Sequence, residues 1–406
     1  MNRYLIIADD FTGSNDTGVQ MRRRGLPTTV MFAGHPIPAD DSSVVIDTES
    51  RGMSGVGAST VTAAAVAKVD FDRFKYIIKK VDSTLRGNVA EEVQAVDKAF
   101  GSQLVIFAPA LPDLGRTTEG GVHRLNGVPI CATELAKDPK KPVKEDRLQA
   151  ILEKVYDEPV KHVSLEAVRD GRIALDGGRI FTFDAVLNSD LKAIIGAAMA
   201  TGKKVLWVGT AAMADNLMEL ESPTWPALGV IASVSEVTRG QVHAAEQAGV
   251  ALVQVPIHEL LAGREGPEPY VAATVASLKG GKDTILLSSS TYDRSELAKS
   301  EKEGKKKGLE THQVSEYVQE LMGDMAKAVL GQTTVSGVFV TGGDTAMGLL
   351  SSTEADGSAI LSEVLVGIPM MRVVGGVMDG TKLISKAGAF GKEDAILFAL
   401  RKLKEK

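Results

Sequence analysis

The sequence predicts an α/β protein of two α/β domains, each with a mainly parallel sheet, and a cleft between them. Short apolar runs that fit buried strands alternate with amphipathic stretches of helix length, the pattern of parallel sheets covered by helices. The length of 406 residues is typical of two domains. Pro223 and Pro226 interrupt the chain near its middle, where they disfavour a continuous helix or central strand. We therefore expect domains at residues 1–222 and 227–406.

The expected strands are short apolar runs that mostly end in polar or glycine-containing sequence. In the first domain they are Tyr4–Ala8, Thr28–Phe32, Ser43–Asp47, Tyr76–Val81, Leu104–Ala108 and Lys204–Val208. The segment 109–190 is richer in proline, glycine and charge, and we interpret it as an insertion or lid. In the second domain the strands are Leu228–Ser233, Ala251–Pro256, Thr284–Ser288, Gly337–Thr341 and Met370–Val374. Ligands of open α/β sheets bind at the carboxyl ends of strands, so the residues after these runs are the candidates for chemistry.

Composition and charge exclude several classes of function. Lysine and arginine number 46 against 52 acidic residues, a net charge of −6, and the basic clusters are short, so nucleic-acid binding is not expected. No apolar stretch is long enough for a membrane span or a signal peptide, and the one cysteine cannot form an internal disulfide. We expect a cytoplasmic protein. The 41 glycines direct attention to loops, since glycine allows sharp turns and close approach to a ligand.

The first strand runs into a dense polar segment, Asp9-Asp10-Phe11-Thr12-Gly13-Ser14-Asn15-Asp16-Thr17-Gly18, ahead of a helix expected to begin near Gly18. These groups suit a polyhydroxylated substrate, and the carboxylates could accept a proton or hold a metal ion. The alternative is an Asx-rich turn with a helix N-cap. A phosphatase of the haloacid dehalogenase type is disfavoured, because Phe11 and Thr12 stand where its second aspartate is needed.

Two later strands run into cationic segments. Arg51 follows the third strand, and the fourth leads into Lys79-Lys80-Val81-Asp82-Ser83-Thr84-Leu85-Arg86-Gly87-Asn88. An arginine past a strand end can grip a carboxylate or phosphate at two points, whereas a single arginine is more often a surface salt-bridge residue. Together the two arginines and the acidic loops favour a small anionic polyol as ligand.

Glycine loops mark the second half of the chain. They are Thr341-Gly342-Gly343-Asp344-Thr345, Gly375-Gly376-Val377-Met378-Asp379-Gly380 and Lys386-Ala387-Gly388-Ala389-Phe390-Gly391. Paired glycines let backbone N–H groups approach phosphate oxygens, and a helix start adds positive potential. A nucleotide-phosphate site is favoured over a set of tight turns, although no Walker A segment or dinucleotide-binding turn is present.

The segments 7–18, 80–88 and 341–346, in this order and spacing, resemble the four-carbon acid sugar kinase family across essentially the whole chain. The resemblance implies an N-terminal acid-sugar-binding domain, a C-terminal ATP-binding domain, and transfer of the γ-phosphoryl group of ATP to the terminal 4-hydroxyl of a four-carbon sugar acid. The run from Gly13 to Gln20 is similar to members acting on D-threonate or D-erythronate; D-threonate is favoured, and 3-oxo-tetronates are the other alternative.

The resemblance also implies site residues. For the substrate they are Asp9, Asp10, Arg51, Lys80, Asp82, Ser83, Thr84 and Arg86, with Asp10 or Asp82 as the catalytic base. For the nucleotide they are Ser233, Gly342, Gly343, Asp344, Thr345 and Gly388. Ala232 and Ala387 depart from the family's usual glycine and hydroxyl residues.

Function hypotheses follow from these residues. We expect Arg51 and Arg86 to hold the substrate carboxylate and Mg²⁺ to bridge the β- and γ-phosphates of ATP; the metal ligands are not identified. The protein could form a homodimer, and the sequence leaves its oligomeric state open. The alternatives from other classes are a non-catalytic sugar-acid sensor and a dehydrogenase or isomerase acting on the same acids.

Overall fold

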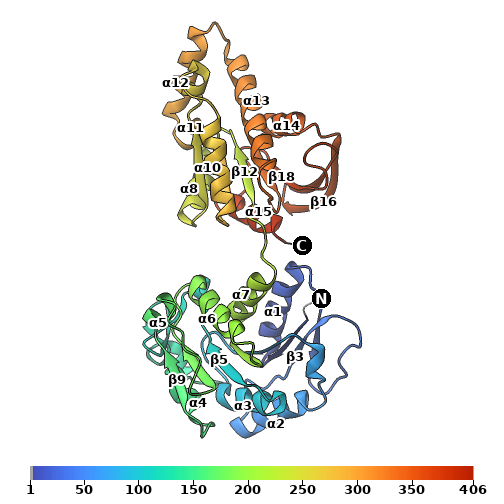
Figure 1. Ribbon diagram of the computed structural model, residues 1–406, viewed down its shortest axis with the longest axis vertical. Coiled ribbons are helices and arrows are strands. Elements are labelled where there is room, and N and C mark those ends of the chain that lie inside the picture. The colour runs from blue at the N-terminus through green and yellow to red at the C-terminus, as the bar shows by residue number, and fades with distance from the viewer. Residues whose placement is uncertain (1–2, 406) are drawn as a thin grey trace. The chain divides into compact units, whose positions relative to one another are not determined.

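The computed structural model describes residues 3–405, and the chain divides between Pro223 and Thr224 into two compact units. Each unit contains one large sheet with helices on both faces (Figure 1). The first unit runs to Pro223, and the second continues to Glu405.

The first unit is built on an eight-stranded parallel sheet of order β2-β3-β1-β4-β11-β5-β10-β9. Its strands are β1 (Tyr4–Ala8), β2 (Thr28–Phe32), β3 (Ser43–Asp47), β4 (Tyr76–Lys80), β5 (Leu104–Ala108), β9 (Val160–Val163), β10 (Ile180–Phe183) and β11 (Val205–Gly209). A separate antiparallel sheet contains β6 (Arg116–Glu119), β7 (Val122–Leu125) and β8 (Val128–Pro129). Strands β1, β3, β4, β5 and β11 are buried along their whole length, which explains their continuous apolar runs.

Helices cover both faces of this sheet. They are α1 (Phe11–Arg23), α2 (Gly55–Val66), α3 (Val89–Phe100), α4 (Leu148–Leu152), α5 (Leu165–Arg169), α6 (Asn188–Ala200) and α7 (Ala211–Glu221). One core cluster packs α1, α5, α6 and α7 against one face, and a second packs α2, α3 and α4 against the other (Figure 1). Side chains alternate between the two clusters along β1, as expected for a strand between two helical layers.

Two sequence expectations need correction here. The segment 109–190 is not wholly an insertion, because β9 and β10 pair with each other and β10 with β5, extending the main sheet. The helix expected near Gly18 begins at Phe11, with the Asp10 side chain accepting a hydrogen bond from the Gly13 N–H as its N-cap.

The second unit contains a seven-stranded sheet of order β13-β14-β12-β15-β18-β17-β16. The strands are β12 (Leu228–Ile231), β13 (Ala251–Val255), β14 (Thr284–Ser288), β15 (Val338–Thr341), β16 (Gly357–Leu365), β17 (Ile368–Val374) and β18 (Lys382–Lys386). Strands β12 to β15 and β18 are parallel, while β17 runs antiparallel to both of its neighbours. The fold is therefore α/β with mainly parallel sheets, as predicted.

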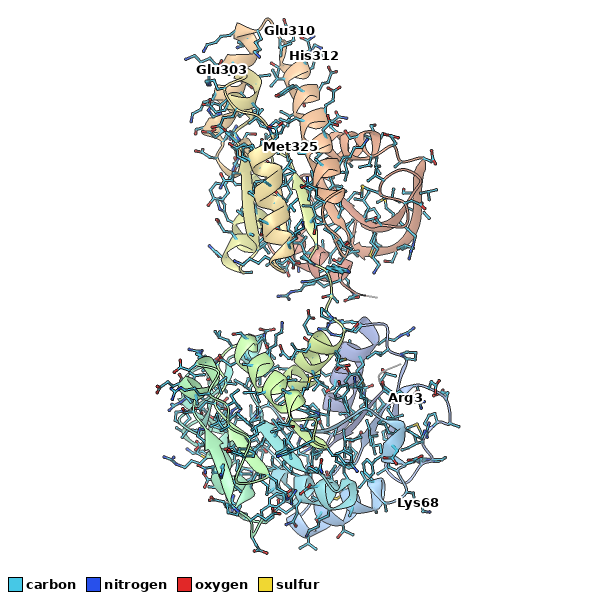
Figure 2. All side chains as sticks on the ribbon, in the orientation of Figure 1. Arg3, Lys68, Glu303, Glu310, His312 and Met325 are labelled. Atoms are coloured by element: carbon cyan, nitrogen blue, oxygen red, sulfur yellow. The ribbon has the colours of Figure 1, made fainter. Side chains whose placement is uncertain are left out.

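The helices of this unit also form two layers. They are α8 (Glu236–Gln247), α9 (Ile257–Ala262), α10 (Glu268–Lys279), α11 (Ser289–Tyr292), α12 (Ser295–Lys306), α13 (Thr311–Leu330), α14 (Gly343–Ser352) and α15 (Ala395–Leu403). Met325 of α13 is buried in the core beside α9, α10 and α14, whereas Glu310 and His312 lie at the exposed start of α13 (Figure 2). Helices α8 and α15 pack on the opposite face.

Candidate functional site

Three neighbouring strands of the first unit bring acidic and basic side chains together at their carboxyl ends. Strand β1 lies between β3 and β4, so Asp9 and Asp10 meet Arg51 and Asp82. The Arg51 guanidinium donates to both oxygens of Asp9, at 2.7 and 2.9 Å, and to both oxygens of Asp10, at 2.7 and 2.8 Å. Its Nη1 lies 3.4 Å from Asp82 Oδ1. Arg51 is therefore surrounded by three carboxylates.

A second cation, Lys80, lies beside these carboxylates as the last residue of β4. It is buried, which lowers its pKa, while the negative charges of Asp9 and Asp10 oppose that effect. A Cβ atom at Gly13 would collide with Lys80 Nζ and with Asp10 Oδ1, so the first turn of α1 passes directly against both side chains. The three aspartates and the cations Arg51, Lys80 and Arg86 balance in charge.

Asp82 organises the loop between β4 and α3. Its Oδ2 accepts hydrogen bonds from the Thr84 N–H at 3.1 Å, the Thr84 hydroxyl at 2.5 Å and Arg86 Nε at 3.0 Å. Its Oδ1 accepts from Arg86 Nη2 at 3.0 Å. Burial disfavours ionisation of this carboxyl, but the bonds from Arg86 and the charge of Arg51 outweigh burial and hold its pKa well below the usual range.

The same loop contains two residues with left-handed backbone. Leu85 has φ +61° and Gly87 has φ +105°. A Cβ at Gly87 would lie 3.1 Å from Asp9 Oδ2 and 3.5 Å from Arg51 Cγ, so the loop passes directly against the ion cluster. Glycine is suited to both demands, the backbone angle and the close approach.

The remaining polar residues of the first segment do not join this cluster. Helix α1 includes Thr12 to Gly18, and the Ser14 and Thr17 hydroxyls donate to the carbonyls of Asp10 and Gly13 within the helix. The N-cap interpretation is therefore right for this run, and Asp9 and Asp10 are its members that reach the site.

Two buried residues beside the cluster, Asp47 and His123, are not among the site residues expected from the sequence. Asp47 ends β3; its Oδ1 accepts from the Glu49 N–H at 3.0 Å, and its Oδ2 has no hydrogen-bond partner among residues 3–405. Burial raises the pKa of Asp47 to about 6. Its position at a strand end was the available signal.

His123 supports the Asp82 loop from the β6–β7 hairpin. Its Nε2 lies 3.0 Å from the Ser83 carbonyl oxygen, and its Nδ1 lies 2.9 Å from the Thr118 hydroxyl. Burial lowers the pKa of His123 to about 4, so the ring is neutral at physiological pH and donates to the carbonyl of Ser83.

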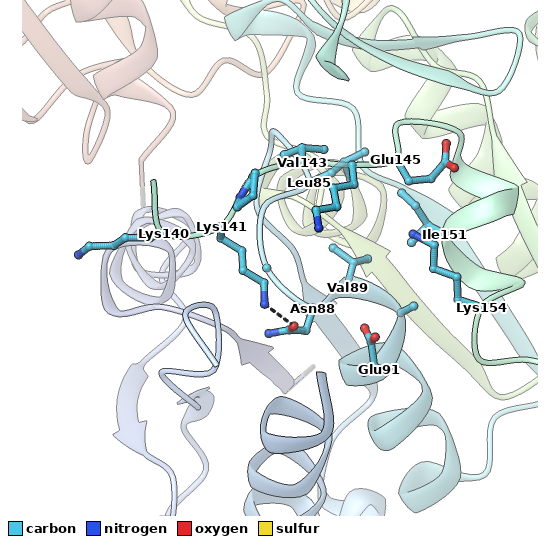
Figure 3. Close-up of a pocket in the computed structure, with 14 residues that line it drawn as sticks. Leu85, Asn88, Val89, Glu91, Lys140, Lys141, Val143, Glu145, Ile151 and Lys154 are labelled. Atoms are coloured by element: carbon cyan, nitrogen blue, oxygen red, sulfur yellow. Dashed lines mark hydrogen bonds between the residues drawn. The ribbon is translucent and has the colours of Figure 1, made fainter. Parts of the chain in front are cut away.

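A pocket of about 400 Å³ adjoins the loop on the side of α3 (Figure 3). Gly87 lines it and also contacts the ion cluster. The lining includes the lysines 140, 141, 144 and 154 against the acidic residues Glu91 and Glu145, so its charge is positive. The Lys141 ammonium donates to Asn88 Oδ1 at 2.7 Å, as Figure 3 shows, and to the Met53 carbonyl.

In the second unit, the residues predicted to bind the nucleotide lie together at the carboxyl ends of the parallel strands. Strands β12, β15 and β18 are adjacent, and Ser233, Gly342 and Gly388 follow their carboxyl ends. Gly342 has φ +91°, caps the start of α14, and donates its N–H to the Lys386 carbonyl at 2.9 Å. A Cβ at Gly388 would lie 2.6 Å from Ser233 Oγ, so these two loops touch.

The other three residues predicted to bind the nucleotide belong to α14. Gly343, Asp344 and Thr345 form the first turn of α14, and the Thr345 hydroxyl lies near Gly342. A glycine pair at a helix start presents backbone N–H groups to an anion.

The glycine loop 375–380 lies elsewhere. It connects β17 to the amino end of β18. It therefore lies at the amino ends of the parallel strands, whereas Gly342 and Gly388 lie at their carboxyl ends. Gly375 donates its N–H to Asp379 Oδ1 at 2.9 Å, and the segment is a tight turn rather than a phosphate loop. In residues 3–405 no cluster of three or more His, Cys, Asp or Glu side chains could hold a metal, and no helix could span a membrane.

Two family models match the chain. A sugar-binding N-terminal domain matches residues 4–217, and a nucleotide-binding C-terminal domain matches residues 228–396. The D-threonate kinase of Salmonella typhimurium is 36% identical, with 99% of each chain covered. That of Bordetella bronchiseptica is 30% identical, covering 99% of this chain and 97% of the relative. The D-erythronate kinase of Heliobacterium modesticaldum is 26% identical, covering 97% and 95%.

A solved structure agrees with this relationship. A Bordetella bronchiseptica protein, crystallised with bound citrate as a domain-swapped dimer, superposes with a TM-score of 0.63 at 27% identity over 99% of each chain. The sequence match and the fold therefore agree over the full length. The chain belongs to the four-carbon acid sugar kinase family.

Proposed function

We propose that this protein transfers the γ-phosphoryl group of ATP to the 4-hydroxyl of D-threonate. D-Erythronate and 3-oxo-tetronates are the alternative acceptors. Family membership and two D-threonate kinases at 36% and 30% identity support this reaction. The structural observation that carries it is the Asp9–Arg51–Asp10 cluster, which offers fixed carboxylates to the hydroxyls of a small polyol.

Asp10 is the proposed catalytic base. Its side chain is 22% exposed, and Arg51 and the Gly13 N–H hold it in one orientation. Asp82 is a weaker candidate, because its oxygens already accept bonds from Thr84 and Arg86 and its pKa is depressed. A carboxylate stabilised so strongly as an anion is a poor proton acceptor. Asp82 instead fixes the loop that holds Ser83 and Thr84 beside the substrate.

For Arg51 we propose an indirect role at the substrate rather than direct contact with the substrate carboxylate. Four of its hydrogen bonds go to Asp9 and Asp10, so it takes part in substrate binding by orienting these carboxylates. Positive charge for the substrate carboxylate then comes from Lys80 and Arg86. The Lys80 ammonium has a 3.4 Å contact with the Val81 carbonyl, and Arg86 Nη1 lies 3.7 Å from Asp138, so both retain donors for an anion.

The nucleotide phosphates are proposed to bind at the start of α14. Backbone N–H groups of Gly343 to Thr345 lie at this end of the sheet, and Ser233 and Gly388 lie in the loops that follow the neighbouring strands. Bound Mg²⁺ would neutralise charge on the β- and γ-phosphates. In residues 3–405 no group of three or more His, Cys, Asp or Glu side chains could hold a metal ion, which fits a metal that arrives with ATP, since Mg²⁺ commonly uses one carboxylate, water and phosphate oxygens. Asp344 is the carboxylate offered there.

The test is ADP release with ATP and Mg²⁺ across the stereoisomers of tetronate and 3-oxo-tetronate. We expect turnover with D-threonate at the highest kcat/KM. Binding of a four-carbon acid without turnover would support a sensor, and the absence of turnover with every acid would refute the kinase proposal. Asp10→Asn should remove most of kcat, while Asp16→Asn, exposed on the same helix, should retain it.

We also propose a homodimer. Strand β16 is the sheet edge of the second unit, most of it exposed, with Ile360 71% exposed. An exposed apolar edge strand is a site for pairing with another chain, and the Bordetella relative forms a domain-swapped dimer. Light scattering of wild type and Ile360→Lys measures the mass; a monomeric wild type would refute the dimer.

A further inference from the structure

Lys386 is a buried lysine at the carboxyl end of a central strand. It is the last residue of β18 and 2% exposed. Its ammonium donates to the Gly388 carbonyl at 2.9 Å, the Ala387 carbonyl at 3.1 Å and the Thr238 hydroxyl at 3.3 Å. Its own carbonyl accepts the N–H of Gly342. Lys386 thus contacts the loops that contain Gly342 and Gly388 and the first turn of α8.

The charge of Lys386 has no partner of opposite sign in the part of the chain that the structure describes. All three of its acceptors are neutral oxygens. The other buried strand-end lysines differ: Lys79 forms an ion pair with Glu92 at 2.9 Å, and Lys80 lies beside the site aspartates. An uncompensated buried ammonium is costly, so its retention indicates that an anion completes the site.

Charged groups on the elements around Lys386 do not supply that anion. They are Glu236, Arg239, His243 and Glu246 on α8, Asp344 on α14, Arg372 on β17, Lys382 on β18, Lys392, Glu393 and Asp394 between β18 and α15, and Arg401 and Lys402 on α15. Glu236 is paired with Arg239 at 2.5 Å, and none of these groups forms an ion pair with Lys386. Burial is the cause that lowers the pKa of Lys386 to about 8.

We propose that Lys386 is the fixed positive charge of the nucleotide site, held behind the Ala387–Gly388 loop to neutralise a bound phosphate. Nucleotide binding should then return a proton to any Lys386 side chain that is deprotonated. This inference rests on the proposed nucleotide-binding function of the same edge. The lysine acts as a positioning and charge-supplying residue, because its N–H groups are engaged by loop oxygens rather than directed to a ligand.

The coupling has a defined sign. A bound phosphate favours the ammonium and raises its pKa, so nucleotide affinity is greatest below pH 8, where the lysine is already charged. Above pH 8 affinity falls, by up to about tenfold for each pH unit, because binding must recover a proton. Proton uptake on nucleotide binding should therefore be larger at pH 8.5 than at pH 7.

Calorimetric titration of the full-length protein with AMP-PNP and Mg²⁺, in two buffers of different ionisation enthalpy at each pH, measures this uptake directly. Wild type needs no substitution for this test. Equal proton uptake at pH 7 and pH 8.5 would overturn the role of Lys386, even if ATP turnover is observed. Failure of wild type to bind AMP-PNP would overturn both this inference and the proposed kinase function.

Variants assign the effect to this lysine. Lys386→Met should weaken AMP-PNP binding at pH 7 by roughly ten- to a hundredfold and leave the residual affinity flat from pH 7 to 9.5. Lys386→Arg, which stays charged throughout, should bind with an affinity that does not fall above pH 8. Lys382→Met, at the other end of the same strand, should keep wild-type affinity and its pH profile. Unchanged affinity in Lys386→Met would contradict the proposal.

Discussion

Asp47 predicts a stability effect that depends on pH. The side chain is 1% exposed, its Oδ2 has no hydrogen-bond partner among residues 3–405, and burial raises its pKa from 3.8 to about 6. The difference, at about 1.4 kcal/mol for each pH unit, makes ionisation of Asp47 cost the folded state roughly 3 kcal/mol. Asp47→Asn removes that ionisation and keeps an acceptor for the Glu49 N–H.

The sign follows from the direction of the shift. The folded-state pKa lies above the unfolded value, so wild type has its full stability below about pH 4 and loses it as pH rises through about 6. We expect Asp47→Asn to be more stable than wild type by roughly 3 kcal/mol at pH 8, with the difference vanishing near pH 4. Urea unfolding at pH 4, 6 and 8 measures it.

Tryptophan fluorescence isolates the first unit in this assay. Of the two tryptophans, Trp207 is buried in the core of β11, and Trp225 is 61% exposed. Asp157→Asn, on the exposed surface of the same unit, is the matched control and should leave stability unchanged. A stability difference for Asp47→Asn that is the same at every pH, or a loss of stability at pH 8, would refute the reasoning.

Three further substitutions test the site. Asp82→Asn should lower kcat less than Asp10→Asn does, and the reverse order in steady-state rates would exchange their roles. Arg51→Lys keeps the charge but not the fork that orients Asp9 and Asp10, so it should raise KM for the acid at least about tenfold while KM for ATP stays constant; an unchanged acid KM would remove Arg51 from this function. Gly388→Ala places a Cβ 2.6 Å from Ser233 Oγ and should raise KM for ATP, and less so in a Ser233→Ala background; additive effects on KM would show that the two residues do not touch.

Sequence could predict most of the fold because burial leaves a simple pattern in parallel strands. Strands such as β1 and β5 are buried along their whole length and therefore read as unbroken apolar runs. Strand β18 was missed because Lys382 and Lys386 stand at its two ends and only a short apolar core lies between them. Strands β9 and β10 were missed because both are short and follow irregular sequence.

The candidate site was predictable by residue type but not by contact. Strand ends identify Asp10, Arg51 and Asp82, since parallel strands share one carboxyl edge. Which cation pairs with which carboxylate depends on side-chain geometry that no spacing encodes, so the contacts of Arg51 with Asp9 and Asp10 were not predicted. The loop 375–380 was expected among the phosphate loops, but it lies at the amino ends of the parallel strands. The antiparallel direction of β17, which places it there, has no signature in the sequence.

The two units treat the same device, a buried strand-end lysine, in opposite ways. Lys80 lies near the carboxylates of Asp9 and Asp10, whose negative charges partly offset the cost of burying its ammonium before any ligand arrives. Lys386 contacts neutral oxygens, and in our proposal the bound phosphate supplies the negative charge opposite it. Where the charges of a site already offset one another, a ligand gains binding free energy only if its hydroxyls form hydrogen bonds as good as those that they replace. Such a site therefore discriminates between ligands by geometry. Where a buried positive charge has no partner of opposite sign, any phosphate close to it gains binding free energy. The proposed substrate site is therefore expected to set the stereochemical selectivity of the reaction.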